Sequence, residues 1–120
     1  MDQQEFIEKL KKYGIEQAVT DYRVLLSATI PAEELKHDEG KLKAKLQGLS
    51  DAEKETLFKY LRTIIEDSTG IILSLLDGSS NIGQVGGKFQ LYYDDEAGQR
   101  HHINNKDGDM LMTLLYDEDE

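Results

Sequence analysis

Two adjacent histidines close behind three acidic residues form the part of this chain best suited to chemistry. In the stretch YYDDEAGQRHHINN, residues 92–105, Asp94, Asp95 and Glu96 come a few residues before His101 and His102. Imidazole and carboxylate groups are frequent zinc ligands and frequent general acids and bases. This stretch is therefore the first candidate for a metal or catalytic site.

The pattern around the histidines favours a solvated β-hairpin instead. Residues 88–93 alternate as a strand does, the sequence DDEAG supplies a turn, and residues 99–104 form the returning strand. Neighbouring side chains leave a strand on opposite faces, so His101 and His102 cannot readily chelate one ion. Pairing one histidine with an acid across the hairpin matches no established ligand spacing. We expect no metal, one half-buried histidine and one surface histidine.

One face of this predicted hairpin is the candidate contact surface for a protein partner. The core side is expected to carry Phe89, Leu91, His101 and Ile103. The outer side carries Tyr92, Arg100 and His102, together with Lys88, Gln90 and Asn104. Tyrosine and arginine side chains often contribute most of the binding energy of an interface. Tyr92, Arg100 and His102 therefore form the predicted contact cluster. The alternative is ordinary cross-strand packing, worth about 0.2–1 kcal/mol per pair.

Other sequences associated with catalysis or ligand binding fail on spacing. In INNKDGDMLMTL, Gly108 at the sixth position of a calcium loop would put Ile103 first and Leu114 twelfth, where carboxylates are required. GQVGGK resembles a phosphate loop, but Phe89 stands where serine or threonine is needed. The chain has no cysteine and no G-x-S-x-G elbow. We predict no catalytic residue, no cofactor, no metal and no enzymatic activity.

The elements before the hairpin are helical by pattern. Apolar residues at helical spacing predict a helix from Asp2 to Tyr13, which Gly14 ends or bends. A second amphipathic helix is predicted to about Ala28, and Pro31 stops it. These two helices form the expected N-terminal part of the fold.

Residues 31–48 are highly charged and carry few apolar positions. The segment is expected to form only one or two weak helical turns on the surface. Gly40 is expected to break it, and Gly48 to close it. It is the least structured part of the predicted fold.

The strongest predicted element is a long helix. Ser50 and Glu53 match a capping box at its start, and Asp77 followed by Gly78 marks its end. Apolar residues recur every three or four positions between them. Gly70 lies inside this helix, where it implies a kink or the close approach of another backbone. The apolar face widens after Ser68, so the second half is expected to be central in the core.

A short C-terminal helix is predicted from the last apolar group, Met110, Leu111, Leu114 and Leu115. Asn105 or Asp107 is the expected start of this helix. A strand through Met110, Met112, Leu114 and Tyr116 is the alternative. The final DEDE opposes the helix dipole, so an acidic tail over residues 117–120 is expected.

These elements define an α+β single domain over residues 1–116. N-terminal helices and one long central helix pack on a small antiparallel β-hairpin, followed by the short C-terminal helix. The expected core consists of Phe6, Ile7, Leu10, Val19, Tyr22, Leu26, Leu57, Leu61, Ile64, Ile65, Ile72, Leu75, Phe89, Leu91, Ile103, Leu111 and Leu114.

The arrangement IILSLLDGSSNIGQ…GKFQLYYDD…HHINN resembles a family of small bacterial α+β proteins. In these proteins a long apolar helix ends in an LLDGSS-type exit and is followed by a hairpin and a short C-terminal helix. The resemblance covers about residues 50–116. It implies the fold, and it implies no activity, cofactor or partner.

Charge and composition limit the classes of partner. The net charge is −10; residues 61–120 carry 12 acidic and 4 basic residues, a net of −8. An acidic field repels phosphate backbones and attracts basic proteins. No apolar run exceeds about three residues, whereas about 20 are needed to span a bilayer. The N-terminal sequence has no basic start followed by an apolar run, so no signal peptide is expected.

The predicted function is a small acidic non-catalytic protein-interaction module, an adaptor or an inhibitor of a basic protein. We expect it in the cytoplasm, bound neither to nucleic acid nor to a membrane. The alternative is an oligomeric structural or regulatory subunit, because the long helix is more apolar than a 120-residue monomer needs. A metal-dependent enzyme is the third and weakest hypothesis.

Overall fold

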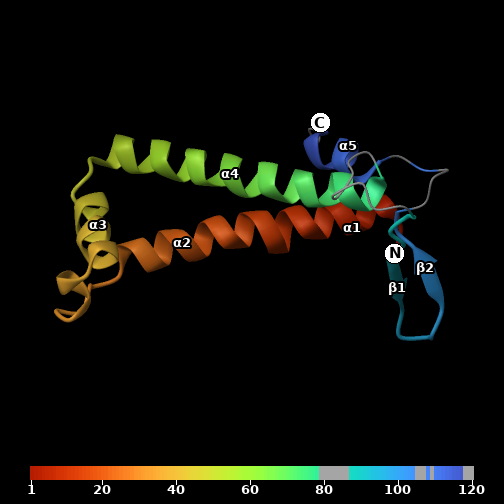
Figure 1. Ribbon diagram of the computed structural model, residues 1–120, viewed down its shortest axis with the longest axis horizontal. Helices are drawn as coiled ribbons and strands as arrows, with labels where there is room; N and C mark the ends of the chain where they lie inside the picture. The colour runs from red at the N-terminus through yellow and green to blue at the C-terminus, as the bar shows by residue number, and fades with distance from the viewer. Residues whose placement is uncertain (79–86, 105–107, 109, 118–120) are drawn as a thin grey trace.

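Two long antiparallel helical rods dominate the computed structural model, which describes residues 1–78, 87–104, 108 and 110–117 (Figure 1). The first rod joins α1 (Gln3–Lys9), the π-helical η1 (Leu10–Glu16) and α2 (Gln17–Ser27). The second rod is α4 (Asp51–Asp77). Between them lie the 3₁₀ turn η2 (Glu34–Lys36) and α3 (Asp38–Gln47). After α4 come β1 (Tyr92–Asp94), β2 (Arg100–His102) and α5 (Leu111–Tyr116).

This element order confirms the predicted α+β class, with its long helix, antiparallel hairpin and short C-terminal helix. Among the described residues, no helix combines the length and the apolar character needed to cross a bilayer. The division into a domain over residues 1–116 and an acidic tail stays a prediction, because residues 118–120 lie outside the described part.

The first rod does not end at Gly14. Asp2 caps its start as predicted, with the Glu5 amide donating to Asp2 Oδ1 at 2.8 Å. The chain then passes through Gly14 in the wider π winding of η1. An α-helix turns about 100° per residue, so Ile7 and Val19 would point about 120° apart without the π segment. The π winding allows both side chains to be buried.

Residues 31–48 are more ordered than predicted, because α3 is a ten-residue helix. Gly40 does not break it but lies inside it, buried where a Cβ atom would overlap the backbone of Glu34. Gly48 closes the helix, as predicted. Gly40 therefore has a packing role against the Glu34 backbone, and helical periodicity does not reveal it.

The boundaries of α4 are confirmed. Ser50 and Glu53 form the reciprocal capping box, and Gly78 adopts the left-handed conformation with φ 77°. Gly70 gives close contact, but with a side chain rather than a backbone: a Cβ there would lie 2.5 Å from Tyr116 Oη. Small size at Gly70 therefore lets α5 lie against α4.

The C-terminal helix α5 is confirmed and the strand alternative is wrong. Its N-cap residue is Met110, so the predicted start at Asn105 or Asp107, which lie outside the described residues, is also wrong. The capping acceptor comes from the end of α4. Asp77 accepts hydrogen bonds from the Leu111 and Met112 amides, both at 2.9 Å.

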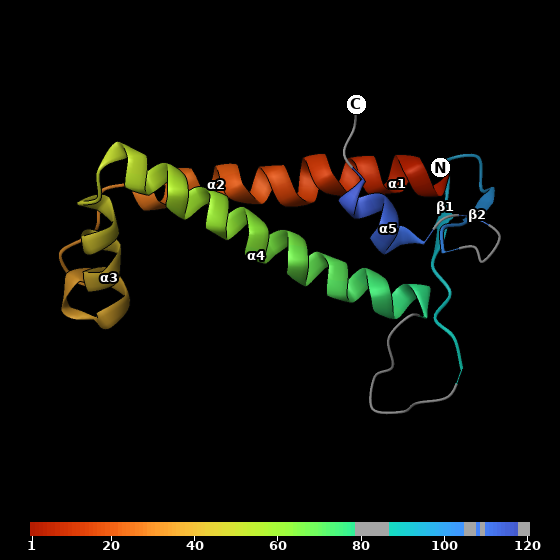
Figure 2. The same cartoon turned by 90° about the horizontal axis from the view of Figure 1, so that it is seen from above.

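The main core lies at one end of the rods, where α1, the end of α4, α5 and the hairpin meet (Figures 1 and 2). Its buried residues are Ile7, Ile15, Leu73, Ile103, Leu111, Leu114 and Leu115. Four residues predicted for the core are exposed: Tyr22, Ile64, Ile72 and Phe89. The second half of α4 is therefore only partly central, since Ile72 keeps 59% of its surface exposed.

The molecule is elongated for its length. Its Cα radius of gyration is 18.7 Å and its principal extents are 52 × 35 × 29 Å. A compact chain of this length would have a radius of gyration of about 14 Å. The rods therefore extend well beyond the main core, and much of their length has no second layer of this chain against it.

Candidate functional site

The predicted contact cluster lies on one face of the hairpin. β1 and β2 pair antiparallel, with Tyr92 opposite His102 and Asp94 opposite Arg100. Residues opposite one another share a face, and residues two apart on a strand also share a face. The register therefore brings Tyr92, Arg100 and His102 together as predicted, and adds Asp94 to them. Both strands are shorter than the predicted ones.

The Tyr92 ring contacts both an imidazole ring and a guanidinium group. The Tyr92 and His102 ring centroids are 4.9 Å apart, and the Arg100 guanidinium lies 5.0 Å from the Tyr92 centroid. Arg100 donates to both carboxylate oxygens of Asp94, at 2.9 and 3.3 Å. This fork fixes Arg100 over Tyr92, which remains 48% exposed. The hydrogen bond from Arg100 also lowers the pKa of Asp94, and the carboxylate raises the pKa of Arg100.

His102 is less exposed than predicted. It is half-buried, and its Nε2 is buried without a hydrogen-bond partner among the described residues. The ring therefore packs against Tyr92 and contributes less exposed surface than predicted. Because His101 is half-buried as well, the expectation of one surface histidine is wrong.

The other hairpin face joins the turn to the N-terminus. His101 Nε2 lies 2.9 Å from Asp95 Oδ2, and His101 Nδ1 lies 3.4 Å from the Met1 amino group. Tyr93 stacks near the same histidine, with centroids 6.1 Å apart. The hydrogen bond with His101, followed by the one from the Gln99 amide, lowers the pKa of Asp95. In the described part of the chain, no group of three or more potential ligands is arranged to hold a metal ion.

Asn104 is the supporting residue that sequence reasoning missed, since it was placed on the outer face. Its amide nitrogen donates to the carbonyls of Leu76 and Phe89, both at 2.7 Å. Its oxygen accepts from the Leu91 amide at 2.8 Å. One side chain thus attaches the base of the hairpin to the end of α4. Nothing in strand alternation signals this role, because its partners are backbone groups 13, 15 and 28 residues away in the sequence.

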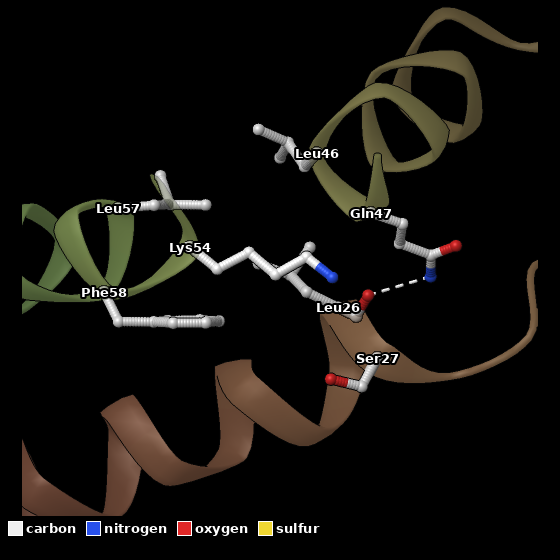
Figure 3. A pocket seen from close by; sticks show the side chains of 7 residues that line it. All are labelled: Leu26, Ser27, Leu46, Gln47, Lys54, Leu57 and Phe58. Carbon is white, nitrogen blue, oxygen red and sulfur yellow. Dashed lines mark hydrogen bonds between the residues drawn. The ribbon is translucent and has the colours of Figure 1, made fainter. Parts of the chain in front are cut away.

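A pocket of about 220 Å³ lies at the opposite end of the molecule, where α2, α3 and α4 meet (Figure 3). It is lined by Leu26, Ser27, Leu46, Gln47, Lys54, Leu57 and Phe58. The Gln47 amide donates to the Leu26 and Ala28 carbonyls, both at 2.8 Å, and so holds α3 against the end of α2. The lining is mainly apolar with one ammonium group, which suits a small apolar group better than any catalytic step. Sequence reasoning missed it because only one or two weak helical turns were predicted where α3 forms a ten-residue helix.

No protein-family model matches the chain, and neither does any curated protein or solved structure. The resemblance to small bacterial proteins with an LLDGSS-type helix exit therefore stays a prediction.

Proposed function

We propose that this chain is a small, acidic, non-catalytic protein-interaction module, an adaptor or an inhibitor of a basic protein. The observation that carries the proposal is the environment of Tyr92. Its ring contacts both His102 and Arg100, yet nearly half of its surface remains exposed. The hairpin bearing it protrudes from one end of the rods (Figure 1).

A tyrosine fixed in this way suits binding for a thermodynamic reason. Association costs about 0.5–1.5 kcal/mol for each flexible side chain that must be immobilised. Stacking against His102 and Arg100 restricts Tyr92 before a partner arrives, so little of that cost remains. Tyrosine and arginine side chains are also enriched among the residues that dominate interface energies. The cluster therefore offers a preordered anchor surrounded by polar groups.

The charge of the chain supports a basic partner. Residues 61–120 have a net charge of −8, and Asp94, Asp95 and Glu96 lie at the hairpin turn beside the cluster. Such a field accelerates encounter with a positively charged surface and repels nucleic acid and acidic membranes. The absence of cysteine is compatible with a reducing cytoplasm, where we propose that the protein acts.

The test is affinity capture from native lysate with the double variant Tyr92→Ala, Arg100→Ala. The matched control is Tyr93→Ala, which removes an exposed tyrosine from the other face of the same hairpin. We expect the double variant to fold, as judged by circular dichroism, and to lose a partner that the wild type and the control both retain. Equal recovery of every protein by all three would contradict the proposed contact surface.

A further inference from the structure

One side of α4 is apolar along most of the helix and is only partly covered by this chain, because Ile64, Ser68 and Ile71 are exposed. Its residues recur at intervals of four and three and include no charged side chain: Leu57, Leu61, Ile64, Ser68, Ile71 and Leu75. Ile64 is 46% exposed and Ile71 is 64% exposed. Alternating intervals of four and three are the heptad spacing with which one helix packs against another.

The first rod carries a matching uncharged row. It consists of Phe6, Leu10, Gly14, Ala18, Tyr22 and Leu25. Val19 and Phe58 are buried, and Arg23 stacks on Phe58, so these residues mark the side on which the rods touch. Each helix turns about 100° per residue, so both rows lie about 60–140° from that contact line, rotated in the same sense about their helix axes. We call these twelve residues of the two rows the apolar face.

The charged contacts between the rods lie on the opposite side. The ion pairs Glu16–Arg62 and Arg23–Glu55 turn away from the apolar face, by the same helix geometry. Gly70 and Tyr116 place α5 on that side as well. Figure 2 shows α5 lying across one side of the space between α4 and α1. The pair of rods therefore has one polar side, on which α5 lies, and one apolar side, on which six of the twelve residues are exposed.

The chain's own core uses only one end of this face, where Phe6 and Leu10 pack against the buried cluster. Among the described residues, nine hydrophobic side chains are buried and fifteen large ones are exposed. Seven of the nine form the cluster at the hairpin end, which leaves Val19 and Phe58 as the buried hydrophobic residues along the rest of the rods. A pair of helices with so little shared core is stable when its apolar side packs against another layer.

We propose that a second copy of this chain covers the apolar face, so that two rod pairs form a four-helix bundle. With helices about 40 Å long and about 10 Å wide, two side by side present roughly 800 Å², which matches what each partner buries in a standard interface. A two-fold axis places the same face on both copies, so each covers the other. The ion pairs and α5 then remain on the outside.

Charge distribution selects a second copy over a basic protein at this face. The twelve residues include no carboxylate with which a partner's lysine or arginine could pair. A basic surface docked there would lose the hydration of its cations without compensation. An identical apolar face carries no such penalty. The proposal is independent of the hairpin cluster, because Tyr92 and Arg100 lie outside the apolar face.

The first test is the mass of the untagged protein in solution, by sedimentation equilibrium, for the double variant Ile64→Glu, Ile71→Glu. The control is Thr56→Glu, Thr63→Glu, which adds the same charges at the same seven-residue spacing on an exposed part of α4 outside the apolar face. We expect wild type and control to approach twice 13.6 kDa as concentration rises. Two carboxylates from each copy, buried in the interface, should weaken the variant dimer by about 100-fold or more.

The second test works even if the glutamate variant fails to fold. Because the chain has no cysteine, Ser68→Cys places a single thiol in the apolar face, and Thr63→Cys places one outside it. The rate of maleimide labelling at Ser68→Cys should fall as protein concentration rises, while that of Thr63→Cys stays constant. Equal behaviour of the two thiols would overturn this face as the interface. A wild-type mass of 13.6 kDa at concentrations up to about 1 mM would overturn the dimer itself.

Discussion

Asn104 shows how a single side chain can decide the placement of a whole element. Its three hydrogen bonds connect Leu76, Phe89 and Leu91, and the first of these belongs to α4. Strand alternation placed Asn104 on the solvent side, because alternation describes the direction of a side chain and not its partners. The contact cluster itself was predictable, since cross-strand pairing follows from the turn position and the alternation of two short strands.

Replacing Asn104 with alanine should weaken the attachment of the hairpin. Leaving part-buried carbonyl and amide groups unpaired costs about 1–3 kcal/mol in the free energy of unfolding. Urea denaturation measures this loss, and hydrogen exchange at the Leu91 and Ile103 amides should accelerate with it. Gln90→Ala, an exposed change in the same hairpin, serves as the control. Unaltered stability of Asn104→Ala would contradict the role given to its side chain.

Acidification should loosen the hairpin turn first. Hydrogen bonds from Arg100 and with His101 lower the pKa values of Asp94 and Asp95 in the folded chain. The unfolded chain therefore binds protons at higher pH than the folded one, so these contacts stabilise above the ordinary aspartate pKa of about 3.9 and are lost below it. NMR signals of the Tyr92 ring report this change between pH 6 and pH 2. In Asp94→Asn the transition should be smaller; an identical profile would rule out the Asp94–Arg100 contribution.

At the scale of elements, the sequence predicted those helix ends that depend on contacts within one helical turn. The ends of α4 follow from Ser50, Glu53 and Gly78, whose partners lie within one helical turn. The start of α5 was not predictable in this way, because Asp77 caps it from 34 residues away. The extent of α3 was missed for a related reason. The place of Gly40 inside the helix depends on its close contact with the Glu34 backbone, and periodicity does not show such a contact.

A double-mutant cycle at Gly70 and Tyr116 tests how α5 packs on α4. In the wild-type background, Gly70→Ala should lower the free energy of unfolding by about 1–3 kcal/mol, because the new methyl group overpacks the Tyr116 ring. With Tyr116→Ala already present, the same change should raise it by about 1 kcal/mol through helix propensity. Urea unfolding of the four proteins gives the coupling. The same sign in both backgrounds would show that Tyr116 does not occupy this space.

At the scale of the whole molecule, periodicity predicts burial but not the covering surface. Tyr22, Ile64 and Ile72 were assigned to the core because they recur at helical spacing, yet this chain leaves them exposed. An amphipathic pattern looks the same whether its apolar side meets the same chain or another one. The elongated shape, with a radius of gyration of 18.7 Å, indicates that much of this apolar side does not meet the same chain.

Salt should affect the two proposed associations in opposite directions. Two copies that each carry a net charge of −10 repel one another, and salt screens this repulsion, so dimerisation through the uncharged face should tighten as ionic strength rises. Binding of a basic partner at the hairpin should weaken over the same range. Sedimentation equilibrium and capture at low and moderate salt measure both. A dimer that dissociates on adding salt would point to an interface built from ion pairs, contrary to the apolar face.

The π-helical segment has a consequence for the chain's tolerance of length changes. Leu10–Glu16 accommodates one residue more than an ordinary helix would need between Ile7 and Val19. Deleting Gly14 leaves eleven residue steps between Ile7 and Val19. At about 100° per step, these end about 20° from a whole number of turns, so an uninterrupted α-helix would still point Ile7 and Val19 into the protein. Residues 17–27 form a regular α-helix without an extra residue, so a deletion there would rotate one end of the rod by about 100°. The deletion lacking Gly14 should therefore fold with near-wild-type thermal stability, while one lacking Thr20 should not.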